Sequence, residues 1–324
     1  MELDRIRDVA KRIKENIKKV IVGKDNVIDL MLISLISSGH VLLEDVPGTG
    51  KTMLAKSLAK SLDCSFKRVQ FTPDLLPSDL SGINFYNQKE GEFEFRPGPI
   101  FTNILLADEI NRATPRTQSS LLECMEEKQV TVDGETRLLD QPFMVIATQN
   151  PVEIQGTFPL PEAQLDRFLI KVDMGYPDTN EGIEILRRFK ERNPLAEIEA
   201  VATKEEIIKA QQNYSKVFVS DDILNYIVRI VELTRQHSDV TLGVSPRGSQ
   251  ALLKAAQVCA ILQGRDFVTP DDIKKIVKPV LGHRIILRNV MGQRQEQLDA
   301  VIEQVLKAVP VPTEDIPIEQ EAKL

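Results

Sequence analysis

Three short segments of the chain carry side chains that could together hydrolyse a nucleoside triphosphate. The first segment ends in Lys51 and Thr52. The second ends in the adjacent acids Asp108 and Glu109, and the third ends in Asn150. In that order they supply a phosphate cradle, a metal-binding acid beside a general base, and a polar group that aligns the attacking water. The sequence therefore predicts an ATPase that uses ATP and Mg²⁺.

The loop before Lys51 has the composition of a phosphate-binding loop. Gly48 and Gly50 allow backbone amides to turn toward phosphate oxygens, and the helix that follows presents its N-terminus to the same anion. Lys51 would reach the outer phosphates, and Thr52 would bind magnesium. Asp45 stands where the strict pattern has its first glycine, and a glycine turn before a solvated lysine is the alternative. The residues predicted to bind nucleotide here are Pro47, Gly48, Thr49, Gly50, Lys51 and Thr52.

The two acids follow an apolar strand that begins at Ile104. A buried strand that ends in two carboxylates is costly unless a positive charge lies there, and a magnesium ion at Asp108 would supply it. Glu109 would then deprotonate the attacking water. Asn150 ends another apolar strand and could align that water. Helix-capping acids and an ordinary turn asparagine are the alternatives.

Two arginines could supply the positive charge that phosphoryl transfer requires around its transition state. Arg167 lies at the edge of the last predicted strand. Arg247 follows Ser245 and Pro246 in the first turn of a predicted helix, where a cation opposes the helix dipole. Binding an anion would explain this position. A surface salt bridge is the alternative for each arginine.

Apolar runs predict five strands, and helical periodicity fills most of the intervals between them. The predicted strands are Val41 to Glu44, Phe66 to Phe71, Ile104 to Asp108, Phe143 to Thr148 and Phe168 to Val172. Amphipathic helices are predicted over residues 2–19 and 53–62. This alternation predicts an α/β fold with a mainly parallel sheet that is covered by helices on both faces.

The character of the sequence changes after residue 177. Residues 178–324 show helical patterns with capping signals at Ser220 and Thr269, and no strand is predicted among them. We expect residues 1–177 to form the nucleotide-binding core and residues 178–324 an all-helical domain. The helix from about residue 180 to 190 could pack on either domain. The acidic stretch from about residue 310 is expected to be poorly ordered.

Composition excludes several classes of protein. The 324 residues carry a net charge of -7, which disfavours nucleic acid as a partner. The cysteines Cys64, Cys124 and Cys259 form no paired spacing, so we expect a reducing, cytoplasmic location. The longest apolar stretch, residues 27–36, contains Asp29 and is too short to span a membrane. The three histidines do not cluster with acids or cysteines, so no bound transition metal is predicted.

Taken together and in order, these residues resemble the AAA+ ATPases, and within them the MoxR family. The resemblance runs from about Ile21 to about Leu287, and its most specific segments are residues 40–52, 108–113 and 158–168. It implies the αβα core of a P-loop NTPase with a parallel sheet, followed by a C-terminal helical lid domain.

The resemblance also assigns roles to single residues. Lys51 and Thr52 match the Walker A motif, Asp108 and Glu109 match Walker B, Asn150 matches sensor 1, Arg247 matches sensor 2, and Arg167 matches the arginine finger that enters a neighbour's site. Val22 and Gly23 lie in a segment that looks like the lining of the adenine pocket. By this reading ATP binding would close the helical domain through Arg247. Arg112 is a further candidate for an interface arginine.

Two segments resemble hairpin insertions of the same branch of AAA+ proteins. One spans Asn84 to Phe95 with a turn at Glu90-Gly91, and the other spans Val130 to Leu138 around the favoured turn Asp133-Gly134. In related rings such hairpins approach the pore and touch clients. The phenylalanines of the first hairpin would then be client contacts, and packing on the core is the alternative.

The family resemblance implies a ring, usually a hexamer, that uses ATP to remodel or mature a partner. MoxR-type proteins typically act with proteins that contain a von Willebrand factor A domain. The chain is therefore expected to be a cytoplasmic chaperone that forms a homo-oligomer, binds no membrane and works with such a partner and a client. The alternatives are an ATP-dependent binding switch with slow hydrolysis, and a helix-2-insert subunit of a chelatase-like or nucleic-acid complex.

Overall fold

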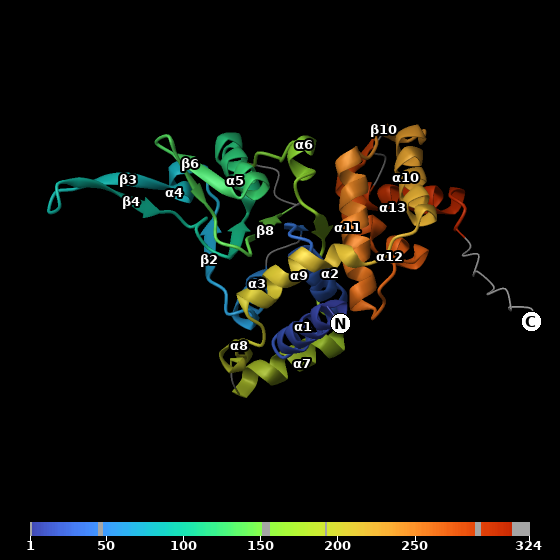
Figure 1. Cartoon of the computed structure of the whole chain (residues 1–324), viewed down its shortest axis with the longest axis horizontal. Helices are drawn as coiled ribbons and strands as arrows, with labels where there is room; N and C mark the ends of the chain where they lie inside the picture. The colour runs from blue at the N-terminus through green and yellow to red at the C-terminus, as the bar shows by residue number, and fades with distance from the viewer. Residues whose placement is uncertain (1, 45–47, 151–155, 192, 289–292, 313–324) are drawn as a thin grey trace, which may run out of the picture.

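The computed structural model describes residues 2–44, 48–150, 156–191, 193–288 and 293–312. The sheet and its hairpins occupy one side of the molecule in Figure 1, and the last helices of the chain occupy the other. None of the described helices is both long and apolar enough to cross a bilayer.

A five-stranded parallel sheet forms the centre of the first part of the chain, as predicted. Its spatial order is β2 (Phe66–Gln70), β5 (Ile104–Asp108), β8 (Met144–Gln149), β1 (Val41–Glu44) and β9 (Ile170–Val172). Glu44 lies beside Gln149, and Gln70 lies beside Asp108. The carboxyl ends of these strands therefore meet at one edge of the sheet, which we call the carboxyl edge; the opposite one is the amino edge.

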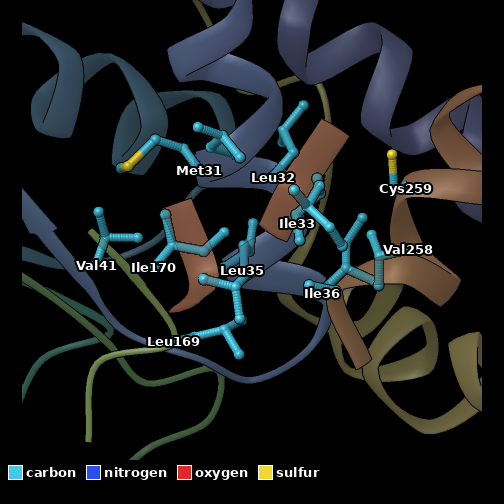
Figure 2. Close-up of a cluster of buried hydrophobic side chains, with 14 of the residues drawn as sticks. Met31, Leu32, Ile33, Leu35, Ile36, Val41, Leu169, Ile170, Val258 and Cys259 are labelled. Atoms are coloured by element: carbon cyan, nitrogen blue, oxygen red, sulfur yellow. The ribbon is translucent and has the colours of Figure 1, made fainter. Parts of the chain in front are cut away.

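The sheet is covered on both faces, because its apolar strands alternate between two hydrophobic clusters. Val41 and Leu43 of β1 point into the larger cluster, and Leu42 points into the smaller one. The larger cluster is built from α1 (Glu2–Lys18), α2 (Asp25–Ile36), α3 (Lys51–Ser61) and helices of the C-terminal region. Figure 2 shows α2 side chains between the sheet residues Val41 and Ile170 and the helix residues Val258 and Cys259.

The smaller cluster lies under the helices on the other face. It contains residues of α4 (Pro77–Ser81), the 3-10 helix η1 (Ile110–Arg112) and α5 (Pro115–Glu127). Cys124 of α5 is buried there, and this burial raises the pKa of its thiol to about 12. Cys124 is therefore a packing residue of this cluster.

Both predicted hairpins are present. β3 (Gly82–Asn87) pairs with β4 (Glu92–Pro97), and β6 (Gln129–Val132) pairs with β7 (Glu135–Leu138). The first hairpin projects from the body of the molecule in Figure 1. Asp133 and Gly134 both have positive φ, as the turn of the second hairpin requires.

The C-terminal region is mainly helical. Its elements are α6 (Glu162–Leu165), α7 (Thr179–Glu191), α8 (Pro194–Glu197), α9 (Lys204–Asn213), η2 (Tyr214–Lys216), α10 (Asp221–Gln236), α11 (Pro246–Leu262), α12 (Pro270–Leu281), η3 (Gly282–Arg284) and α13 (Arg294–Ala308). The prediction that residues 178–324 are all-helical was wrong in one detail, because β10 (Val240–Leu242) and β11 (Ile286–Leu287) form an antiparallel pair. These strands are too short to show a periodic pattern in the sequence.

Helices α7 to α9 pack beside the N-terminal helices. Arg188 of α7 donates to the backbone oxygens of Lys18 and Lys19, at 2.7 and 3.0 Å. Val201 N–H donates to Ser61 O of α3, at 2.9 Å. The helix predicted near residues 180–190 therefore contacts the core side. The division at residue 177 stays a prediction, and the tail predicted from about residue 310 falls largely outside the described residues.

Candidate active site

The predicted phosphate-binding loop connects β1 to α3 at the carboxyl edge. Gly48 and Gly50 have φ values of +87° and +93°, which side chains other than glycine rarely adopt. A methyl group added at either glycine would meet no other atom within 4 Å, so the backbone conformation alone requires glycine. Helix α3 begins at Lys51, directly after this loop. Pro47 was predicted to bind nucleotide and lies outside the described residues.

The acidic pair lies at the same edge and is held by β8. Thr148 Oγ1 donates to Asp108 Oδ1 at 2.6 Å and accepts from Glu109 N–H at 2.8 Å. Glu109 has a φ of +57°, a left-handed conformation that is uncommon for a residue with a side chain. Backbone strain of this kind concentrates at functional sites. The buried hydroxyl of Thr148 therefore holds both acidic residues, Asp108 by its carboxylate and Glu109 by its backbone amide.

Three further side chains contact these acids: Arg68 and Gln70, which the sequence analysis did not assign, and Arg112, which it gave as a candidate interface arginine. Arg68 of β2 donates from Nε and Nη2 to Asp108 Oδ2, at 3.0 and 2.6 Å. Gln70 Nε2 donates to Glu109 Oε2 at 2.7 Å, and Arg112 Nε lies 2.8 Å from the same oxygen. β2 is a neighbour of β5 in the sheet, and this pairing of distant segments left no signal in the sequence.

The residues present fit a magnesium ion. The Asp108 side chain is only 14% exposed, and its carboxylate already pairs with the cation of Arg68, so the site stabilises positive charge. The carboxylate of Asp108 and the hydroxyl of Thr52, the second residue of α3, are the hard oxygen ligands that Mg²⁺ prefers. Magnesium commonly takes one or two such protein ligands together with nucleotide phosphates and water.

Asn150 and the predicted adenine-pocket segment complete the carboxyl edge. Asn150 directly follows Gln149, the last residue of β8, whose side chain donates to Glu44 Oε1 at 2.5 Å. Gly23 lies so close to Glu181 at the start of α7 that an added Cβ would meet Glu181 Oε1 at 1.8 Å. Val22, beside it, is half-buried. The start of α7 therefore packs on the segment that contains Val22 and Gly23.

The two candidate arginines lie together at the amino edge. The carboxylate of Glu126, near the end of α5, forms an ion pair with each of them. Arg167 Nε lies 3.2 Å from Oε2, and Arg247 Nη2 lies 2.6 Å from Oε1. The neighbouring residue Met125 accepts a hydrogen bond from His40, which directly precedes β1. His40 and Glu44 are four residues apart along this strand, which corresponds to about 13 Å.

This placement differs from one expectation. Arg247 was expected to reach the nucleotide of its own chain, and the structure does not bring it to Lys51. Both arginines lie at the amino edge, which is separated from the predicted phosphate-binding loop by the length of the strands. Sequence alone could not detect this, because α11 meets α5 only in the folded chain.

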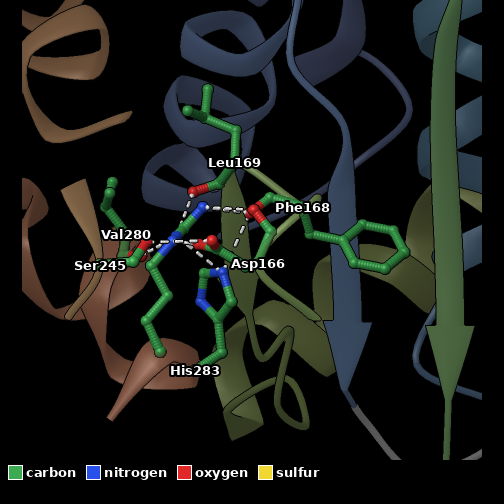
Figure 3. A network of polar contacts seen from close by, with 7 residues as sticks. Asp166, Phe168, Leu169, Ser245, Val280 and His283 are labelled. Atoms are coloured by element: carbon green, nitrogen blue, oxygen red, sulfur yellow. Dashed lines mark hydrogen bonds and ion pairs between the residues drawn. The ribbon is translucent and has the colours of Figure 1, made fainter. Parts of the chain in front are cut away.

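A buried polar network fixes the segment around Arg167. Arg284 of η3 is 3% exposed and forms an ion pair with Asp166 at 2.6 Å, while Ser245 donates to the other carboxylate oxygen of Asp166 at 3.1 Å. Figure 3 shows Asp166, Ser245 and His283 converging beside Phe168 and Leu169. Arg284 also donates to the backbone oxygen of Phe168 at 2.7 Å. Because Ser245 is two residues before Arg247, the network sets both arginines relative to each other.

A cavity of about 320 Å³ lies at the amino edge between α5, α11 and the segment that precedes β9. Among its lining residues are the cations Arg167, Arg247, Lys128, Lys254 and Arg284 and the carboxylates Glu126 and Asp166. Burial lowers the pKa of Lys128, and the charge of Lys254 lowers it further. The cavity therefore has an excess of positive charge.

Comparisons with known proteins agree with the fold. A family model described as "ATPase family associated with various cellular activities (AAA)" matches residues 40–170, and one described as "AAA lid domain" matches residues 232–305. YeaC of Bacillus subtilis is 54% identical over 93% of this chain and 94% of its own length. Chaperone MoxR1 of Mycobacterium tuberculosis is 41% identical over 91% of this chain and 80% of its own length. A crystal structure from Cytophaga hutchinsonii, titled as that of a proposed ATPase, superposes with a TM-score of 0.88 at 40% identity, covering 96% of this chain and 97% of the other.

Proposed function

Since this chain belongs to the MoxR family of AAA+ ATPases, we propose that it is a Mg²⁺-dependent, ring-forming chaperone whose ATP sites are shared between neighbouring chains. The observation that supports this most strongly is the separation of the candidate site residues onto two opposite edges of one sheet. Lys51, Asp108 and Glu109 lie at the carboxyl edge, whereas Arg167 and Arg247 lie at the amino edge. Two copies in head-to-tail contact would bring the two edges together.

The carboxyl edge would bind ATP and activate water. Lys51 and the loop amides would hold the outer phosphates, and Thr52 and Asp108 would hold Mg²⁺, which when bound neutralises phosphate charge. Glu109 would take the proton of the attacking water, which Asn150 would orient. Gln70 fixes the direction of the Glu109 carboxylate by its 2.7 Å hydrogen bond.

The amino edge of the neighbouring chain would supply Arg167 and Arg247 to the terminal phosphate. Two guanidinium groups there would stabilise the charge of the transition state, as arginine fingers do. In this arrangement Arg247 acts on the neighbour's nucleotide, which replaces the expectation that it closes the lid over its own.

An unpartnered helix face supports assembly into an oligomer. Helix α7 is amphipathic, and none of its described side chains is buried. Its apolar residues Ile183, Leu186 and Phe189 are 45%, 72% and 49% exposed. Apolar surface of this kind marks protein interfaces. A hexamer is the ring size that the family resemblance suggests.

The exposed hairpin supports a role on a client protein. Phe93 is 74% and Tyr86 is 53% exposed, and their rings contact each other at 5.3 Å. Phe95 instead packs on Phe101 and beneath Arg137 of the second hairpin. We therefore assign client contact to Phe93 and Tyr86, and packing to Phe95. A partner with a von Willebrand factor A domain and a cytoplasmic location are parts of the same proposal, drawn from the family.

ATP turnover per protomer over a wide range of protein concentration tests this function. The rate should rise with concentration as rings assemble. Glu109→Gln should bind ATP without turning it over, and Arg167→Ala should bind ATP but lose turnover by about 1,000-fold. Arg229→Ala, which removes an exposed arginine of α10, is the control and should retain the full rate.

Two outcomes would contradict the proposal in different ways. A rate that is independent of concentration and survives Arg167→Ala would exclude shared sites. Tight ATP binding with negligible turnover at all concentrations would instead favour the nucleotide-dependent binding switch.

A further inference from the structure

Glu126 joins two parts of the chain that are far apart in sequence. Its carboxylate lies between Arg167, from the segment before β9, and Arg247, from the first turn of α11. The two arginines contact different oxygens of this one side chain, Oε2 and Oε1. Glu126 is therefore a direct link between the amino edge of the sheet and α11, beside the hydrogen bond of Ser245 to Asp166.

The charge balance of the cavity makes this link necessary. The cations that line the cavity repel one another, and without a nearby anion this repulsion would keep them apart. Of the two described lining carboxylates, Asp166 is already engaged by Arg284 and Ser245. Glu126 is the carboxylate that remains to hold Arg167 and Arg247 side by side.

The contacts leave donors that could bind an incoming anion. Arg167 contacts Glu126 through Nε, and its two Nη groups can serve a second anion. Arg247 meets Glu126 through Nη2, which leaves its Nη1. A guanidinium group has five N–H donors and can bind two anions at once. The pair can thus keep Glu126 while it binds a phosphate.

The position of Glu126 is itself fixed. The preceding residue, Met125, accepts the hydrogen bond of buried His40 at 3.0 Å and is itself 3% exposed. Two residues further on, Lys128 ends α5 in a left-handed conformation with φ of +54°. The backbone oxygen of Lys128 also accepts from Leu139 N–H at 2.9 Å, so the backbone on both sides of Glu126 is held by hydrogen bonds.

We propose that Glu126 is a positioning residue that holds Arg167 and Arg247 as one pre-organised pair for the terminal phosphate of a nucleotide bound by a second copy of the chain. This inference rests on the proposed shared site. A pair that is aligned in advance loses less conformational entropy on meeting the phosphate, which favours the transition state. Without Glu126 the arginines would separate, and the phosphate would have to draw them together.

Glu126→Gln tests the proposal in the full-length protein. We expect turnover per protomer at saturating ATP to fall by about 10- to 100-fold, because the neutral amide cannot balance two guanidinium charges. The dissociation constant for ATP should change less than about twofold, because a chain's own carboxyl edge supplies most of its contacts to ATP and the arginine pair of its neighbour acts chiefly in the transition state. Glu127→Gln is the matched control: it makes the same charge change on the next residue of α5 and should retain the wild-type rate.

A mixing experiment separates positioning from a structural effect. Glu126→Gln chains keep an intact carboxyl edge, whereas Glu109→Gln chains keep intact arginines. Mixed rings should therefore regain turnover, since Glu109→Gln chains complete the sites of Glu126→Gln chains. Glu126→Gln mixed with Arg167→Ala should regain none. Thermal melting of Glu126→Gln close to that of the wild type would show that the fold is kept.

The possible failures can be told apart. A Glu126→Gln protein with unchanged or raised turnover, in a chain where Arg167→Ala is inactive, would overturn the positioning role alone. Failure of Glu126→Gln to recover with Glu109→Gln, where Arg167→Ala does recover, would also overturn it. Full activity of Arg167→Ala would overturn the shared site and with it the role of Glu126.

Discussion

Acid should destabilise this protein through His40, the buried histidine that precedes β1. The His40 ring is 4% exposed, donates from Nε2 to Met125 O at 3.0 Å, and accepts at Nδ1 from Val145 N–H at 2.9 Å. Burial lowers the pKa of His40 from 6.5 to about 4, and the hydrogen bond to Met125 offsets only part of that effect. A proton on Nδ1 would also break the bond to Val145.

The sign and size of the effect follow from this pKa. The unfolded chain binds a proton at His40 more readily than the folded chain between about pH 6.5 and about pH 4, so the free energy of unfolding falls as the pH falls through that range. The full loss is about 3 kcal/mol, because each factor of ten in proton affinity corresponds to about 1.4 kcal/mol. At about pH 5 the loss is about 2 kcal/mol.

Urea unfolding followed by far-UV circular dichroism at about pH 7.5 and about pH 5 measures this loss. His40→Gln cannot take up the proton, so its free energy of unfolding should fall by about 2 kcal/mol less than that of the wild type over the same interval. NMR titration of the His40 Cε1–H resonance gives the pKa directly. A value near 6.5, or equal pH dependence in the variant and the wild type, would refute the reasoning.

Four further substitutions test other parts of the structure. Ile33→Ala should lower the free energy of unfolding by about 2–5 kcal/mol, because Ile33 is 1% exposed in the core; urea denaturation would contradict this if the loss were below about 1 kcal/mol. Phe93→Ala should change that free energy by less than about 0.5 kcal/mol, whereas Phe95→Ala, its matched partner on the same hairpin face, should lower it measurably more. Arg68→Ala should lower the Mg²⁺ concentration needed for nucleotide binding by up to about fivefold, since it removes a competing cation from Asp108. The 47% exposure of the Arg68 side chain limits the gain to about 1 kcal/mol. An increased requirement for Mg²⁺ in a titration would count against this prediction.

Local patterns in the sequence were enough to identify the candidate residues of the carboxyl edge. Lys51, Thr52, Asp108 and Glu109 lie in contiguous segments whose chemistry depends on near neighbours, such as a glycine loop before a helix or an apolar strand before two acids. Strand order, by contrast, depends on which strands pair. Arg68 and Gln70 contact the two acids only because β2 lies beside β5.

The chain by itself determined that there is a parallel sheet, that a glycine loop leads from one of its strands into a helix, and that two acids follow another of its buried strands. These features arise from short-range hydrophobic periodicity, glycine conformation and the position of charges next to buried strands. Only the tertiary structure decided that Arg167 and Arg247 share Glu126 at the amino edge. That arrangement depends on how α11 packs against α5 and on the ion pair of Asp166 with Arg284, contacts between segments more than 100 residues apart. Such contacts are selected by the packing of the whole core, which no local pattern encodes.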